Sequence, residues 1–500
     1  MSNLSELLPA GGAGKVMDFV ASGTLPNGKA VVLKGDGQVE VISGTTFSES
    51  IPAGSEAIFN TGNTVLMSVS AISFDPNTAG KFVVAYRDSS NSRYGTACVG
   101  TISGTSISFG AEVVFNSGNT YYSAISFDPN AAGKFVVAYM DNSNSNYGTA
   151  IIGTMLGTSI SFGSEVVFNS GESTNFSVSF DPNTANKFVI TYMDSGNSSY
   201  GTAIVGTRSG TSISFGSEVV FNSSSTDRID SSFDPNNANK FVAVYWDAGN
   251  SYYGTAIVGT VSGTSISFGS EYVYNSAATY SSSISFDPSA AGKFVVTYKD
   301  NGNSNYGTAI IGIVSGTSIS YGSESVFNLS ATSSTSVAFD PNNSGKFVVA
   351  YQDGGNSQYG TVIVGTVSGT SISYGSEFVV NATDTYFSSV AFDPNNSGKF
   401  VVAYQDSGAT PTAGAAIVGQ IAATATNLTS TNFVGITSKA ISNTATGPIT
   451  LQGGISTNQS SLTVGSTYYV QANGTVSTVS TSPAVNIGKA ISATSLILKG

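Results

Sequence analysis

The chain has 500 residues, with 18 Lys or Arg, 30 Asp or Glu and no His, which gives a net charge of −12. Without His a Ser-His-Asp triad and a His-based metal site are excluded, and the lone Cys98 excludes an internal disulfide. An acidic chain without a basic stripe argues against nucleic-acid binding, and no 18-residue apolar run indicates membrane insertion. We therefore expect no cofactor, no metal, no nucleic-acid partner and no membrane insertion.

Residues 1–14 have neither a basic flank nor an apolar segment, so they do not read as a secretory signal. We expect them to form a flexible tail, or one that a partner orders. Residues 15–52 contain strand-like runs with Asn27-Gly28 and Asp36-Gly37 between them, which are strong hairpin signals. This segment is predicted to be the first part of a flanking β domain.

Residues 53–423 carry one phrase seven times at a fixed step of 53 residues. It reads Phe-Asp-Pro, then an Asn/Ser-rich turn, then Lys-Phe-Val, and its aspartates are Asp75, Asp128, Asp181, Asp234, Asp287, Asp340 and Asp393. A repeat of this length with strand signals is typical of propellers and other repeat arrays, in which neighbouring units must stack to bury their apolar faces.

Each repeat predicts four short strands, here called A to D from the start of the phrase. In the second repeat they are Tyr121–Phe127 (A), Lys134–Tyr139 (B), Thr149–Thr154 (C), and Ser159–Phe162 with Glu165–Phe168 (D). Strand B is a continuous apolar run, which fits a strand covered on both faces. Asp128-Pro129-Asn130 suits the turn from A to B. The pattern predicts an all-β fold, a seven-bladed β-propeller.

The two ends of the array complement each other. The last repeat, with strand A at Phe392, lacks strand D, and an orphan copy of it, Gly54–Asn60, precedes the first strand A. We predict that this N-terminal strand closes the last blade, because a closed ring hides edge strands that an open array would have to cap.

Residues 424–500 again contain strand-like runs, at Ile449–Leu451 and from Tyr468 through Asn473-Gly474. Because the ends of a closed ring lie close together, we expect residues 15–52 and 424–500 to form one small β domain in which the propeller is inserted.

Three polar positions recur in every repeat and are predicted to serve the scaffold. They are an Asp that closes strand B, a Glu on strand D and a Lys that opens strand B, and we expect the lysines to pair with the repeated carboxylates. The loop after strand B resembles a calcium loop, but its acidic ligands are too few.

The A–B and C–D turns are nearly identical between repeats, whereas three other sets of positions differ, and all three are expected on the opposite face. The predicted binding residues there are Arg87, Met140, Met193, Trp246, Lys299, Gln352 and Gln405 at the end of strand B, Arg93 and Tyr252 in the B–C loop, and Tyr121, Tyr122, Phe176, Arg228, Tyr280, Tyr386 and Phe387 in the D–A loops. Tyr, Trp and Arg are frequent anchors of binding surfaces, and aromatic faces beside polar groups suit sugars. Trp246 with Tyr252 is the predicted contact patch; the alternative is drift in exposed loops.

The flanks resemble proteins of marine tailed bacteriophages, especially those of cyanobacteria, in Ser2–Gly12, Phe19–Gly28, Thr431–Gly435, Val464–Gln471 and Ser492–Gly500. The repeats also resemble the Asn-Ser-x-Tyr-Gly-Thr-Ala-Ile-Val-Gly arrays of such proteins. The resemblance implies a virion structural protein, a tail fibre or a head or tail decoration, assembled in the host cytoplasm and extracellular in the particle. It supplies no site residues.

Three functions are compared. The first is a tail fibre-like protein, not an enzyme, that binds a host-surface glycan or lipopolysaccharide and contacts other virion proteins through its terminal β domain. The second is a decoration protein that stabilises the particle and has no ligand. The third is a glycan depolymerase, in which Asp227 and Asp230 would flank a pocket as the required pair of carboxylates. The sequence does not decide between a monomer and a homotrimer.

Overall fold

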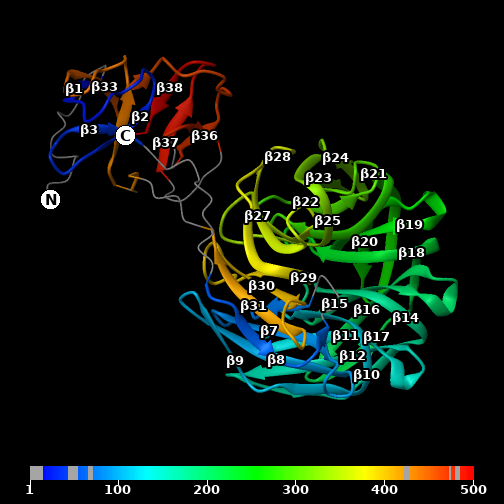
Figure 1. The fold of residues 1–500 in the computed structure, drawn as a ribbon. Coiled ribbons are helices and arrows are strands. Elements are labelled where there is room, and N and C mark those ends of the chain that lie inside the picture. The colour runs from blue at the N-terminus through cyan, green and yellow to red at the C-terminus, as the bar shows by residue number, and fades with distance from the viewer. Residues whose placement is uncertain are drawn as a thin grey trace. The chain divides into compact units, whose positions relative to one another are not determined.

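The computed structural model describes residues 15–42, 54–65, 71–421, 427–429, 431–471, 474–478 and 485–499. The chain divides into two compact units, Met1–Ser48 with Ala423–Gly500 and Glu49–Ala422. The described residues are strands and turns without an α-helix, apart from three 3-10 turns at Asn142–Asn144, Ser195–Asn197 and Ala248–Asn250 (Figure 1). The prediction of an all-β chain is confirmed, and the predicted tail 1–14 lies outside the described residues.

The terminal unit contains a five-stranded sheet built from both ends of the chain. Its order is β1-β33-β32-β2-β3, with β1 at Val16–Val20, β2 at Ala30–Leu33, β3 at Val39–Val41, β32 at Phe433–Thr437 and β33 at Thr446–Leu451. The Asp36-Gly37 hairpin is confirmed, because β2 pairs with β3. The Asn27-Gly28 hairpin is wrong: β1 pairs with β33 and β2 with β32, so long-range partners separate the two strands.

A second five-stranded sheet of this unit comes from the C-terminal segment alone. Its order is β34-β38-β37-β35-β36, with β34 at Ile455–Ser456, β35 at Thr467–Val470, β36 at Val476–Ser477, β37 at Val485–Ala490 and β38 at Leu496–Leu498. A common cluster of buried residues includes Val32 of the first sheet and Ile487 of the second. The two sheets therefore share a core.

The repeats form a β-propeller of four-stranded antiparallel blades. The B strands are β7 (Lys81–Asp88), β11 (Lys134–Asp141), β15 (Lys187–Asp194), β19 (Lys240–Asp247), β22 (Lys293–Asp300), β26 (Lys346–Asp353) and β30 (Lys399–Asp406). The C strands are β8 (Tyr94–Ser103), β12 (Tyr147–Leu156), β16 (Tyr200–Ser209), β20 (Tyr253–Ser262), β23 (Tyr306–Ser315), β27 (Tyr359–Ser368) and β31 (Ala413–Gln420).

Strand D begins as a short piece in most repeats: β9 (Ser106–Phe109), β13 (Ser159–Phe162), β17 (Ser212–Phe215), β24 (Ser318–Tyr321) and β28 (Ser371–Tyr374). It then continues without a loop into strand A of the next repeat. The joined strands are β10 (Val113–Phe127), β14 (Val166–Phe180), β18 (Val219–Phe233), β21 (Ser265–Phe286), β25 (Ser325–Phe339) and β29 (Phe378–Phe392).

The expected D–A loops are therefore wrong, because each segment is one long strand bent at a β-bulge. In β10 the register with β11 shifts between Tyr121 and Ala124, and the same shift recurs in the other joined strands. The bulge residue has a left-handed backbone in each case: Tyr122, Asn175, Arg228, Ser281, Ser334 and Phe387. A bulge bends a strand and redirects its side chains, so no separate turn is needed.

The N-terminal strand pairs with the last repeat, as predicted. Strand β4 (Ala57–Asn60) pairs antiparallel with β31, and the chain continues through β5 (Thr64–Val65) and β6 (Ile72–Phe74), both of which pair with β7. Gly54 N–H also donates to the Val418 carbonyl at 2.8 Å. Strands from the two ends of the array thus complete one blade.

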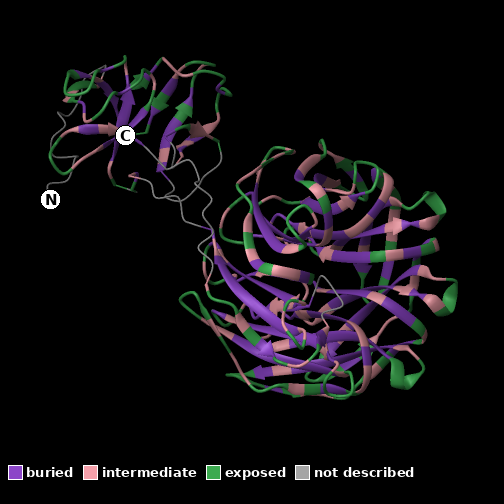
Figure 2. Ribbon diagram, in the orientation of Figure 1, coloured by how far each residue is buried: buried purple, intermediate pink, exposed green. Residues whose placement is uncertain are grey.

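The core lies between neighbouring blades, where strands B and C are buried on both faces (Figure 2). Val83 and Val84 are consecutive in β7, yet Val83 packs with the second repeat and Val84 with the last. Cys98 lies in the second of these clusters, as expected of a small core residue. The prediction of a B strand covered on both sides is confirmed.

Repeated polar residues tie the strands of each blade together. The Tyr139 hydroxyl of strand B donates to Glu165 of strand D at 2.6 Å, and the equivalent pair is present in all seven repeats. The expected pairing of the repeated lysines with carboxylates is wrong for Lys81, Lys134 and Lys187, whose ammonium groups donate to a threonine hydroxyl of strand C. The threonine hydroxyl is a neutral acceptor within hydrogen-bond distance of the ammonium group, so no carboxylate is needed there.

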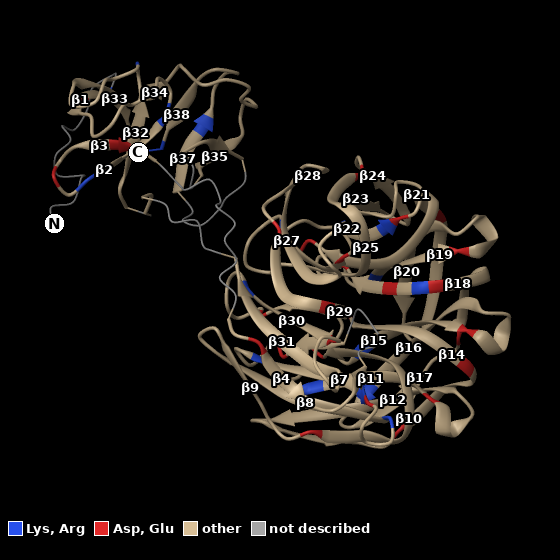
Figure 3. Ribbon diagram, viewed as in Figure 1, with Lys and Arg blue, Asp and Glu red and all other residues tan. Residues whose placement is uncertain are grey.

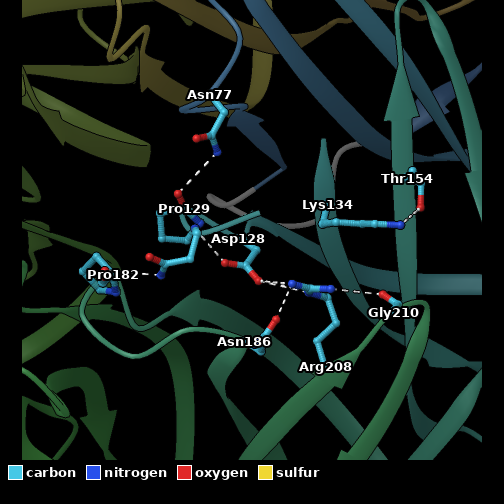
Figure 4. Close-up of polar contacts among 10 residues, drawn as sticks. Asn77, Asp128, Pro129, Lys134, Thr154, Pro182, Asn186, Arg208 and Gly210 are labelled. Atoms are coloured by element: carbon cyan, nitrogen blue, oxygen red, sulfur yellow. Dashed lines mark hydrogen bonds and ion pairs between the residues drawn. The ribbon is translucent and has the colours of Figure 1, made fainter. Parts of the chain in front are cut away.

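In six repeats the turn reads Phe-Asp-Pro-Asn, and its Asn links one blade to the next (Figure 4); the fifth repeat has Ser289, which contacts Ser344. Asn77 Nδ2 donates to the Pro129 carbonyl at 3.3 Å, and Gly133 N–H donates to the Asp75 carboxylate at 3.1 Å. The same asparagine contact recurs around the propeller and ends with Asn395 on Pro76 at 3.2 Å. These inter-blade bonds explain why the A–B turns are uniform in sequence.

One blade junction uses a different bond. Asn186 replaces the turn glycine there, and Arg208 reaches Asp128 with an N···O distance of 2.9 Å, both side chains being buried (Figure 4). Arg208 also donates to the Asn186 side chain and the Gly210 carbonyl. A buried guanidinium is thereby matched by a carboxylate and two further acceptors, as burial of a charge requires.

Candidate functional site

The variable positions lie at the end of the propeller opposite to the A–B turns. In β11, Lys134 follows the turn, whereas Met140 at the other end pairs with Tyr121 of β10. Charged side chains are sparse over the whole molecule, so the chemistry of this end depends on a few residues (Figure 3).

Three predicted residues form an aromatic cluster at this end. Trp246 near the end of β19 lies with its ring centroid 4.5 Å from Tyr252 of the B–C loop and 6.1 Å from Tyr280 of β21. Tyr252 is 45% exposed, while Trp246 and Tyr280 are half-buried. Trp246 Nε1 is buried and has no hydrogen-bond partner among the described residues. The cluster therefore presents aromatic rings at the surface, of which Tyr252 is the most exposed.

The same three positions meet in the first repeat. Arg87, Arg93 and Tyr121 correspond to Trp246, Tyr252 and Tyr280, and the Arg87 guanidinium lies 4.6 Å from the centre of the Tyr121 ring. We call such a set a rim triplet. It consists of the residue before the Asp that closes strand B, the B–C loop residue five positions after that Asp, and the residue that faces them on the next joined strand. A rim triplet thus spans two adjacent blades.

Two other rim triplets contain a buried residue at the end of strand B. Met140 is 6% exposed and belongs to a core cluster, and Gln352 is 4% exposed and donates to Asp384 at 3.0 Å. Their prediction as binding residues is wrong, because the neighbouring strand covers them. Met193, Lys299 and Gln405 are half-buried, and Tyr386 of the Gln352 triplet is exposed.

The bulge decides which D–A residues reach the surface. Phe176, predicted to bind, is 2% exposed and packs on Phe168 and Tyr192, because the bulge at Asn175 turns the next side chain into the core. Tyr122 is half-buried, and Phe387 packs partly against a core cluster. The remaining predicted residue, Arg228, is exposed and forms an ion pair with Asp227.

Loop members of the rim triplets have unusual backbones. Arg93, Tyr252 and Gln358 each have φ of 63°. The left-handed region disfavours side chains other than Gly, Asn and Asp, at roughly 1–2 kcal/mol per residue. This cost was not visible in the sequence, because the loop reads as an ordinary Asn/Ser turn.

The acid pair considered for a depolymerase does not share a cleft. The Asp230 carboxylate is buried and accepts bonds from the Ser177 and Ser283 hydroxyls and from the Ser231 and Ile284 N–H groups. Burial raises its pKa, against the effect of these bonds. The predicted pocket between Asp227 and Asp230 is wrong, because Asp230 belongs to the polar contacts between A strands.

Sequence reasoning missed a cavity of about 360 Å³ at the A–B turn end. It is lined by the phenylalanines of all seven Phe-Asp-Pro phrases and by prolines that include Pro76 and Pro129. The repeated Phe-Asp-Pro sequence was visible. Its phenylalanines come together around one cavity only when the repeats are arranged as a propeller.

Comparisons with known proteins give no family. No protein-family model and no curated protein matches the chain. Similar solved structures include Sqt1 of Saccharomyces cerevisiae (12% identity, TM-score 0.45, 75% of this chain and 100% of that one). A chain of the mitotic checkpoint complex (8%, 0.48, 75% and 95%) and Sqt1 of Chaetomium thermophilum (13%, 0.44, 71% and 84%) are also similar. No helix among the described residues is long and apolar enough to span a bilayer.

Proposed function

We propose that this protein is a bacteriophage virion structural protein, tail fibre-like, that attaches to a host-surface glycan or lipopolysaccharide through the Trp246 rim triplet. The observation that carries the proposal is the meeting of Trp246, Tyr252 and Tyr280 at one blade junction. The phage assignment rests on the sequence resemblance, and the binding role rests on the geometry of this triplet.

The chemistry of the Trp246 triplet suits a saccharide. Aromatic faces take the apolar faces of sugar rings, and the hydroxyls of Tyr252 and Tyr280 can supply hydrogen bonds beside them. Tyr252 keeps a large side chain where the backbone favours Asn. The aromatic side chain therefore costs folding free energy at this position, and a binding role would offset that cost.

The path of the chain is consistent with presentation of the rim triplets to a ligand. Gly54 and Ile421, where the described chain enters and leaves the propeller, both lie at the A–B turn end, since Gly54 bonds Val418 and Ile421 bonds Gly398. The rim triplets lie at the opposite end. We infer that the terminal unit contacts other virion proteins and that a closed ring of seven blades, inserted in that unit, presents its rim triplets to the host.

The test is binding of purified protein to host cells and to extracted lipopolysaccharide. The double variant Trp246→Gln with Tyr252→Gln introduces the pair that already occupies the equivalent positions, Gln352 and Gln358. We expect at least a tenfold loss of affinity, the effect of removing one binding hot spot, about 1.4 kcal/mol or more.

The matched control is Lys299→Gln with Asn305→Gln, which places the same Gln pair at the neighbouring junction and is expected to leave binding unchanged. Equal binding by the Trp246 double variant would overturn the proposed site. Absence of any cell binding, together with tight binding to particles that lack this protein, would instead support the decoration role.

A further inference from the structure

We propose that a second rim triplet, Arg87, Arg93 and Tyr121, binds an anionic group, the carboxylate or phosphate of an acidic saccharide. This site goes beyond the proposed attachment through Trp246 and does not require it, because the two triplets belong to different blade junctions.

The first argument is charge without a counter-ion. The ion pairs among the described residues include Arg208 with Asp128 and Arg228 with Asp227, but none involves Arg87 or Arg93. The chain has only four arginines and a net charge of −12, so acidic partners are abundant elsewhere. Two neighbouring guanidinium groups left unpaired in such a chain favour an external anion.

The second argument is that the two arginines act on each other and on one phenol. Burial lowers the pKa of Arg87, the nearby Tyr121 opposes this, and Arg93 lowers it further. The pKa of Tyr121 is lowered by a hydrogen bond with Asn119 and by the charges of Arg87 and Arg93. An anion placed between the guanidinium groups would relieve the repulsion of like charges.

The third argument is preorganisation. The Arg87 Cζ lies over the Tyr121 ring, 4.6 Å from its centre, and Arg87 Nε is buried without a hydrogen-bond acceptor among the described residues. A planar guanidinium binds carboxylates and phosphates through two parallel hydrogen bonds. Arg93, like Tyr252, retains a long side chain at a left-handed position.

The experiment measures binding of the full chain to defined probes by titration calorimetry. Oligogalacturonate is compared with its methyl ester, and a phosphorylated mannose oligosaccharide with the unphosphorylated one, so that carboxylate and phosphate ligands are distinguished. We expect at least one acidic probe to bind ten times more tightly than its neutral counterpart, and to weaken as NaCl is raised.

The variant Arg87→Gln with Arg93→Gln turns this triplet into Gln, Gln and Tyr, the residues of the sixth repeat, so the fold already accommodates it. We expect it to lose the preference for the acidic probe, while Arg228→Gln, which removes a paired arginine, keeps it. Equal affinity for acidic and neutral probes, or a preference that survives in the double variant, would overturn the proposal. Failure of the Trp246 proposal is separate, because Trp246→Gln with Tyr252→Gln should still prefer the acidic probe.

Discussion

The Tyr404 hydroxyl donates a 2.7 Å hydrogen bond to Glu56, a residue 348 positions earlier in the chain. The same bond joins Tyr139 to Glu165 within a single repeat. The blade that combines both ends of the array is therefore held by the same contact as blades made of continuous sequence.

This equivalence predicts equal stability losses. Tyr404→Phe and Tyr139→Phe each remove one half-buried hydrogen bond to a carboxylate and should lower the free energy of unfolding by a similar amount, about 1.5–3 kcal/mol. Urea denaturation of both variants checks this. A markedly smaller loss for Tyr404→Phe would mean that the β4–β31 contact contributes little in solution.

The seven strand B tyrosines predict a steep loss of stability in alkali. Burial, with the neighbouring glutamate, raises the pKa of Tyr139 far above its usual value, and the other six behave alike. Above pH 10 the unfolded chain loses these protons and the folded chain keeps them, so stability falls as pH rises, by about 1.4 kcal/mol per pH unit for each tyrosine. Thermal melts from pH 9 to 12 should show the fall, and Tyr139→Phe should reduce its slope by one proton.

The left-handed loop positions predict stabilising substitutions. Tyr252→Asn and Gln358→Asn should each raise the free energy of unfolding by about 0.5–1 kcal/mol, because Asn tolerates φ of 63° better. Asn305→Gln, the reverse change at an equivalent site, should cost a similar amount. Denaturant midpoints measure all three, and stabilisation in the reverse variant would contradict the assignment of strain.

Because the Asp230 carboxylate is buried, its replacement is predicted to raise the free energy of unfolding by an amount that depends on pH. Equivalent positions hold Ser177 and Ser283, whose hydroxyls accept the same kind of N–H bond between A strands. The folded-state pKa of Asp230 is raised, so the wild-type protein loses stability as pH rises from about 4 through that value. Asp230→Ser should gain about 1 kcal/mol at pH 7, and the gain should shrink in acid. Tm values of both proteins at pH 4.5 and 7 decide it.

Much of the architecture was predictable because the same strand and turn pattern occurs in seven repeats. Strand B of the second repeat was expected at Lys134–Tyr139 and lies at Lys134–Asp141, and the pairing of β4 followed from counting strands. The D–A connection was not predictable, because its bulge residues, such as Tyr122, Asn175 and Arg228, share no turn chemistry.

The candidate site was predictable in part. Trp246 and Tyr252 were expected together and do meet, since a fixed repeat carries equivalent positions to equivalent places. The burial of Phe176 was not, because one bulge reverses the facing of the residue that follows it. The hydrogen-bond acceptors of the lysines were also not predicted. The sequence alone does not show whether a lysine ammonium group meets a threonine hydroxyl or a carboxylate.

The pairing of β4 with β31 has a consequence for translation. The ribosome releases Ala57–Asn60 early, and the segment that must cover it, Ala413–Gln420, is among the last of the propeller to emerge. A nascent chain therefore has an unpaired β4 until β31 has been synthesised. A product that terminates earlier keeps an exposed strand edge that can pair with other chains. Closure of the propeller therefore requires synthesis at least to Gln420, because β31 is the strand that pairs with β4.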